Sequence, residues 1–199
     1  MATLPEPQLV WFAAALDDLA DFLLSGDVFR PLSRPSRGKF LDLSLGALIL
    51  TGDALRADAG QMSPSDRSEW SGLQVRWEAE RQRHAVAIER KAAAELPNRV
   101  NLWRAYLSDL GEKPEEARGY PTEVRHRVIL DRLREILPTP TAAPIITALD
   151  RLDKTLRRWF APGPFAWPDP LRPAYPEARF WYLYGRPERG LILANPARL

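Results

Sequence analysis

Apolar side chains recur at helical spacing in several segments of this chain, and polar residues, glycines and prolines separate these segments. In residues 9–23, Leu9, Phe12, Leu16, Leu19 and Leu23 form one apolar stripe, while the aspartates of the segment lie off it. This spacing predicts an amphipathic helix. The other predicted helices cover residues 40–57, 63–96, 98–110, 121–137 and 141–160.

Two of these helices depend on particular boundary residues. Residues 40–57 also allow a short strand, because apolar residues alternate near their start, but the length of the segment favours a helix. Ser63 followed by Pro64 is typical of a helix N-terminus, so a long helix is predicted to begin there. Pro97 is expected to end it, since proline disrupts a helix interior, and Asn98 would then cap the next helix.

The composition changes after residue 160. Residues 161–199 hold eight of the 19 prolines, but they are also rich in tryptophan, tyrosine and phenylalanine, which disordered tails avoid. We therefore predict a mainly α protein, with a bundle of about six helices in residues 1–160. Residues 161–199 would form an extended C-terminal segment packed on the bundle, in which residues 179–184 and 190–193 could make one small β-hairpin.

The composition also excludes several kinds of chemistry. The 199 residues contain no cysteine and two histidines, so a disulfide framework, a thiolate nucleophile and Cys-ligated metal sites are excluded. The phosphate-binding loop, the dinucleotide-binding fingerprint and the serine nucleophile motif are absent from the sequence. We therefore expect no cofactor, and an enzyme is the less favoured class. The motifs point to no particular family.

Charge and hydropathy indicate the cellular compartment of the protein. Residues 1–29 carry five acidic residues and no lysine or arginine, which does not fit a secretory signal. The longest apolar runs are well short of the roughly 20 residues that span a bilayer. We expect a soluble cytoplasmic protein without a membrane partner. Arginine outnumbers lysine by 24 to 4, which is typical of a GC-rich genome such as a bacterial one.

Two pairs of residues suggest a metal site as an alternative. Glu123 and His126 are three residues apart, and Glu80 and His84 are four apart, so each pair shares one helix face. Helical bundles that hold two iron ions use paired Glu and His in this manner. A metal-dependent helical-bundle enzyme is therefore the second hypothesis, although ordinary structural roles also account for both histidines. On that simpler interpretation His126 lies on the surface.

The C-terminal segment combines arginines with aromatic rings. Such a mixture is typical of protein interfaces, but single-stranded nucleic acid also binds it, and the rings could equally be buried against the bundle. The small net charge of +2 argues against nucleic acid. Our first hypothesis is a non-enzymatic binding or adaptor protein with a protein partner or self-association through the long helix 63–96; a nucleic-acid-binding regulator is the third. The candidate binding residues are Trp167, Arg179, Trp181, Tyr184 and Arg186.

The polar segment 30–38 offers one more candidate. Ser33 and Ser36 lie among Arg30, Arg34 and Arg37, a pattern that could bind or accept a phosphate. The simpler interpretation, which we favour, is a solvated loop between two helices.

Overall fold

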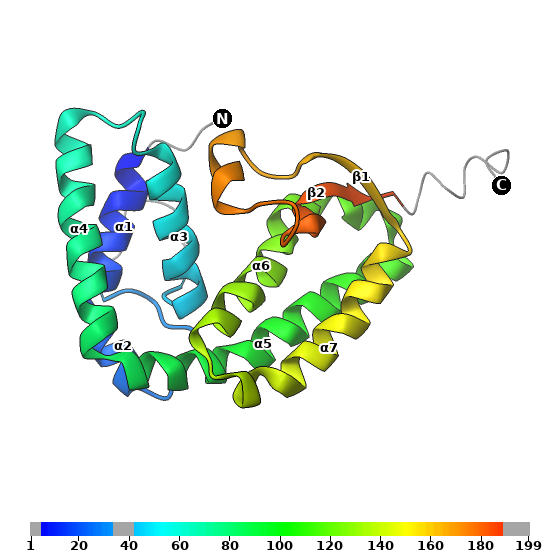
Figure 1. Cartoon of the computed structure of the whole chain (residues 1–199), viewed down its shortest axis with the longest axis horizontal. Coiled ribbons are helices and arrows are strands. Elements are labelled where there is room, and N and C mark those ends of the chain that lie inside the picture. The colour runs from blue at the N-terminus through cyan, green and yellow to red at the C-terminus, as the bar shows by residue number, and fades with distance from the viewer. Residues whose placement is uncertain (1–4, 34–41, 189–199) are drawn as a thin grey trace, which may run out of the picture. The chain divides into compact units, whose positions relative to one another are not determined.

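The computed structural model describes residues 5–33 and 42–188, and these are mainly α-helical, as the sequence predicts (Figure 1). The chain divides into two units. The first contains Met1–Glu95 and Arg132–Leu137, and the second contains Leu96–Asp131 and Pro138–Leu199. Helices α5 and α6 contribute residues to both units. The expected division at residue 160 stays a prediction.

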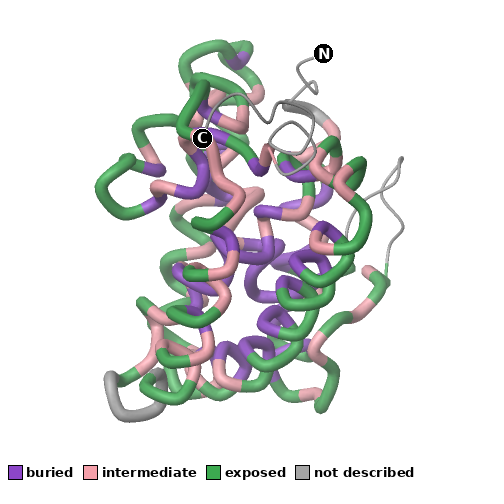
Figure 2. Tube along the Cα trace, turned by 90° about the vertical axis from the view of Figure 1, so that its right-hand side faces the viewer, coloured by how far each residue is buried: buried purple, intermediate pink, exposed green. Residues whose placement is uncertain are grey.

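In the first unit, α1 (Pro5–Asp17) packs against α3 (Leu45–Asp58) and α4 (Pro64–Arg83). The ring of Phe12 is fully buried and makes an edge-to-face contact with Trp70, the two centroids being 5.4 Å apart. A side chain at Gly52 would place its Cβ 3.3 Å from the Phe12 ring, so glycine allows α3 to approach α1 closely. Figure 2 shows buried positions recurring along the helices, with exposed positions between them.

Helix boundaries in the first unit follow local hydrogen bonding. The Ser63 hydroxyl accepts from the Asp66 amide at 3.1 Å, which confirms the predicted cap of α4. The predicted helix 9–23 is divided at Asp18 into α1 and α2 (Leu19–Leu24). The Asp18 carboxylate accepts from the Ser33 amide at 2.7 Å, which ties the following loop to this point. Most of the arginine- and serine-rich segment, including Ser36, lies outside the described residues.

The long helix expected over residues 63–96 is wrong in two respects. It is interrupted at His84, where α4 ends and α5 (Ala85–Glu112) begins. Pro97 does not end a helix but lies inside α5, so no separate helix starts at Asn98. Leu96, Val100 and other apolar side chains of the later turns are buried, and this packing keeps the helix continuous across the proline.

The second unit combines the end of α5 with α6 (Tyr120–Ile136, up to Asp131), α7 (Thr139–Arg157) and a small sheet. The antiparallel sheet pairs β1 (Phe160–Phe165) with β2 (Tyr184–Pro187), with Ala161 opposite Arg186. A two-stranded sheet was expected, but its strands differ from the expected segments. The segment 179–184 contains the 3-10 helix η3 (Trp181–Leu183), and residues 190–193 lie outside the described part. Two more 3-10 helices, η1 (Pro114–Gly119) and η2 (Asp169–Ala174), connect the elements.

Gly185 determines how closely the two strands approach. Its φ of +146° is a conformation that other residues rarely adopt. A Cβ at this position would lie 2.1 Å from the carbonyl oxygen of Ala161 and 2.8 Å from the ring of Phe160. The pairing of β1 with β2 therefore requires glycine here.

Candidate functional site

The Arg- and aromatic-rich segment of the second unit contains both buried and accessible rings. Phe165, Tyr175, Phe180 and Tyr182 are buried. Trp167, Trp181 and Tyr184 are only partly buried. Arginines 179 and 186 are exposed. The segment thus attaches to its unit through one set of rings and presents another set at the surface.

Tyr182 holds this segment through a buried polar network. Its hydroxyl donates to Asp131 Oδ2 at 2.7 Å, and its carbonyl accepts from the Tyr120 hydroxyl at 2.5 Å. The guanidinium of Arg127 lies over the Tyr182 ring, with its carbon 4.6 Å from the ring centroid. Arg127 also makes two parallel hydrogen bonds to Asp153, each 2.9 Å long, and contacts Asp131 at 2.9 Å.

The charges of this network explain the protonation of its members. Burial raises the pKa of the Tyr182 hydroxyl well above its ordinary value, so the hydroxyl keeps the proton that it donates. Burial is the largest single influence on Arg127 and lowers its pKa, but Asp153, Tyr182 and Asp131 together outweigh burial, so the pKa of Arg127 is raised. Asp153 of α7 therefore pairs with a buried arginine of α6.

A hollow of about 250 Å³ lies beside this anchored segment. We call it the Trp181 hollow, and its lining residues are Arg157, Phe160, Pro162, Glu177, Trp181 and Tyr184. The Arg157 guanidinium carbon is 3.7 Å from the centroid of the Trp181 ring, and Phe160 meets the same ring edge to face at 5.2 Å. Tyr184 is fixed by a 2.9 Å hydrogen bond from its hydroxyl to the carbonyl of Tyr175.

Of the five candidate binding residues, Trp181 and Tyr184 therefore line one hollow. The Trp167 indole is instead fixed by a 2.7 Å hydrogen bond to the carbonyl of Pro121. Arg179 lies over the Phe180 ring and donates to the carbonyl of Asp131 at 3.4 Å. Arg186 lines a second hollow of about 390 Å³ on the same unit.

The four candidate metal ligands fall in different units. Glu80 and His84 are 3.2 Å apart in the first unit, and Glu123 and His126 are 3.7 Å apart in the second. Within residues 5–33 and 42–188, no group of three or more histidine, aspartate and glutamate side chains could hold a metal ion. The described residues therefore offer no observation that favours the metal-dependent enzyme.

His126 differs from its expected surface position, because it is 5% exposed. Its Nδ1 lies 3.1 Å from Nη1 of Arg99. A guanidinium can only donate, so Nδ1 must carry a lone pair and the neutral ring holds its proton on Nε2. Burial, Arg99 and Arg125 together lower the pKa of His126 from its ordinary value of 6.5 to about 4. The sequence could not show this contact between two helices.

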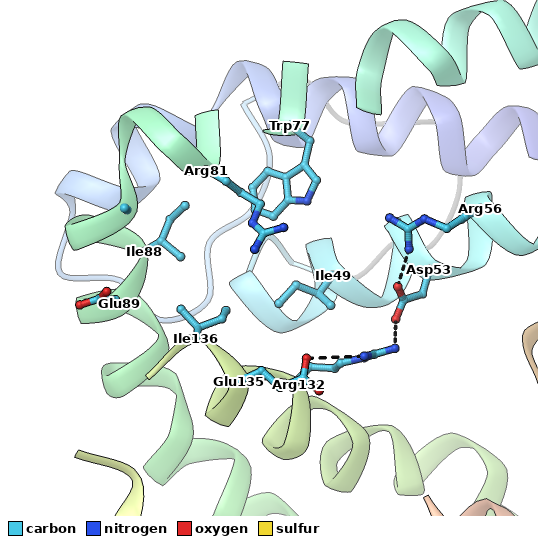
Figure 3. Close-up of a pocket in the computed structure, with 12 residues that line it drawn as sticks. Ile49, Asp53, Arg56, Trp77, Arg81, Ile88, Glu89, Arg132, Glu135 and Ile136 are labelled. Carbon is cyan, nitrogen blue, oxygen red and sulfur yellow. Dashed lines mark hydrogen bonds and ion pairs between the residues drawn. The ribbon is translucent and has the colours of Figure 1, made fainter. Parts of the chain in front are cut away.

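A larger cleft, of about 410 Å³, lies entirely within the first unit (Figure 3). It was not predicted, because four helices contribute to it. We call it the Arg81 cleft, and its lining residues are Ile49, Gly52, Asp53, Arg56, Trp77, Arg81, Ala85, Ile88, Glu89, Arg132, Glu135 and Ile136. Asp53 accepts from Arg56 at 2.9 Å and from Arg132 at 3.0 Å. The Arg81 guanidinium lies near the Trp77 ring, 5.9 Å from its centroid.

Comparison with family models, curated proteins and solved structures gives no match to this chain. Among the described residues, no helix has both the length and the apolar character needed to cross a membrane.

Proposed function

We propose that this chain is a non-enzymatic binding or adaptor protein that recognises a partner protein through the Trp181 hollow. The observation that carries the proposal is the partly exposed Trp181 ring with the Arg157 guanidinium 3.7 Å from its centroid. Tryptophan, tyrosine and arginine are the residue types that contribute most binding energy at protein interfaces. The hollow brings all three types together.

The rigidity of the surrounding segment supports this proposal. Trp181 directly precedes Tyr182, whose hydroxyl and carbonyl are both engaged in buried hydrogen bonds. A side chain that is already ordered loses less conformational entropy when a partner binds. The hollow therefore suits recognition of a partner without large rearrangement of the segment around Trp181.

The charge of the hollow favours a protein over a nucleic acid. Glu177 lines the hollow together with Arg157, so the formal charges of these two residues cancel. A nucleic-acid surface requires a concentration of cations that follows the phosphate backbone. A second copy of this chain would be a protein partner of the same kind, and the proposal places either partner in the cytoplasm.

Capture from a cell lysate, with and without nuclease, tests the proposal. The tagged protein should retain a stoichiometric protein partner after nuclease treatment. Trp181→Ala should weaken the purified interaction about 30-fold or more, the loss typical of a central interface residue. Arg157→Gln should weaken it in the same direction. Arg158→Gln is the matched control, because Arg158 is exposed and next in sequence but does not line the hollow.

Three outcomes would contradict the proposal. The first is a partner that binds Trp181→Ala and Arg157→Gln as tightly as it binds the wild type. The second is capture that collapses with nuclease, which would move the nucleic-acid-binding regulator to first place. The third is the absence of any captured protein together with a constant molecular mass across concentrations, since this would exclude self-association as well.

A further inference from the structure

The charged residues on one side of the Arg81 cleft already form ion pairs with one another. Asp53 is 9% exposed in its side chain and bonds to both Arg56 and Arg132. Arg132 also reaches Glu135 at 3.6 Å. These four residues form a series of alternating charges. A ligand that bound one of them would have to break an existing ion pair.

Arg81 is held differently. Its ion pair is with Glu78 of its own helix, at 3.4 Å, and both side chains are about half exposed. Exposed pairs of this kind contribute little stability, so a ligand can replace Glu78 at small cost. Figure 3 shows the Arg81 side chain running beneath Trp77 toward the space between the isoleucines of the cleft.

The remaining wall of the cleft is apolar. Ile49, Ile88 and Ile136 come from three different helices and line the same space, with the Trp77 ring above them (Figure 3). The volume of about 410 Å³ is typical of sites that enclose a small organic molecule. The cleft therefore combines the guanidinium of Arg81, whose partner Glu78 can be displaced, with a surface of hydrocarbon and aromatic side chains.

The charges of the cleft restrict which anion fits. Arg56, Arg81 and Arg132 are balanced by Asp53, Glu89 and Glu135. A doubly charged phosphate would be repelled by these carboxylates, whereas one carboxylate can form two parallel hydrogen bonds with Arg81.

We propose that the Arg81 cleft binds a small-molecule monocarboxylate whose apolar or aromatic body lies against Ile49, Ile88 and Ile136. The carboxylate replaces Glu78 on the Arg81 guanidinium. This site is separate from the Trp181 hollow and does not depend on the function proposed for it, because all of its lining residues belong to the first unit.

Methyl NMR of the full chain with labelled isoleucine δ1 groups tests the proposal. The probe is indole-3-acetate, and the matched control is its neutral amide, indole-3-acetamide. We expect saturable shifts of the Ile49, Ile88 and Ile136 methyls, with a dissociation constant on the order of a millimolar. The amide and inorganic phosphate should leave these methyls nearly unchanged. Isoleucines 129, 145 and 146 of the second unit provide internal references.

Variants separate a specific site from general apolar binding. Arg81→Gln should weaken binding of indole-3-acetate about tenfold or more, because it removes the charged partner of the carboxylate. Arg83→Gln is the control, since Arg83 lies on the same helix, is 68% exposed and does not line the cleft. Ala85→Phe should block binding by filling the cleft. The proposal is overturned if the amide binds as tightly as the acid, if Arg81→Gln binds normally, or if the three methyls do not respond.

Discussion

The buried His126 makes the stability of the second unit depend on pH, and the dependence can be worked out from its environment. In the folded protein the ring is neutral and accepts a hydrogen bond from Arg99, and its pKa is about 4. In the unfolded chain the pKa returns to 6.5. Between these two values, the unfolded state binds a proton that the folded state does not bind. The free energy of unfolding therefore falls as the pH is lowered through this range.

The size of the effect follows from the difference between the two pKa values. His126 is predicted to lower the free energy of unfolding by about 2 kcal/mol on going from neutral pH to about pH 5. The full loss, reached below pH 4, is about 3 kcal/mol. The loss levels off there because the folded state then binds the proton as well.

Urea unfolding of the wild type and His126→Gln, repeated from pH 7.5 down to 5, isolates this contribution. Glutamine can still accept a hydrogen bond from Arg99 but does not titrate, so the difference in stability between the two proteins should change by about 2 kcal/mol over this range. Titrating carboxylates affect both proteins and cancel in the difference. A difference that stays constant with pH would refute the reasoning. An NMR titration giving His126 a pKa near 6.5 in the folded protein would refute it as well.

Three further predictions concern the stability of the two units, and urea unfolding measures each of them. Gly185→Ala should cost about 2 kcal/mol or more because of its positive φ and the blocked space, whereas Gly163→Ala, whose Cβ would meet its nearest neighbour at an ordinary 3.7 Å, should cost much less. Asp153→Asn should cost about 3 kcal/mol, because the buried Arg127 loses its two-point charged partner; a loss under 1 kcal/mol would contradict the network. Lys91→Met should cost about 2 kcal/mol, since the ammonium donates to the carbonyls of residues 25 and 27, and hydrogen exchange should show faster opening of that loop.

The sequence predicts helices well where spacing and boundary residues agree. Residues 120 to 138 are the best case: Pro121 suits the first turn, Pro138 follows the last, and α6 runs from Tyr120 to Ile136. The spacing fails to show the interruption at Asp18, because the apolar stripe of the first helix continues across it. The hydrogen bond that Asp18 accepts from the Ser33 amide, 15 residues later, likewise leaves no signal in the local pattern.

Pro97 shows how packing overrides a local rule. A proline inside a helix costs about 3 kcal/mol. Leu96, Val100, Trp103 and Leu107 are each at most 4% exposed, and burial of one such side chain contributes about 1.5–3 kcal/mol. The sum exceeds the cost, so the helix continues. This burial free energy cannot be read from the local sequence, because it depends on the residues that the other elements of the unit pack against the helix.

The sites depend on the same kind of long-range information. The unusual composition of the Arg-rich aromatic segment drew attention to Trp181 and Tyr184, which are partly buried in the structure, and their role in binding stays a prediction. The sequence could not pair Arg157 with Trp181, because the two residues are far apart in the sequence and no spacing rule relates them. The Arg81 cleft was missed for the same reason: its residues come from four segments, none of which carries a motif.

The hydrogen bonds of Tyr182 have a consequence for synthesis of the chain on the ribosome. They connect residue 182 to residues 51 and 62 positions earlier. At translation rates of about 5–20 residues per second, about 3–12 s pass between the synthesis of Tyr120 and that of Tyr182. For part of that time the Asp131 carboxylate lacks the Tyr182 hydroxyl, and β1, once it has been made, lacks its partner strand. The second unit is therefore incomplete until the residues of β2 have been made. Until then its aromatic surface is accessible to chaperones.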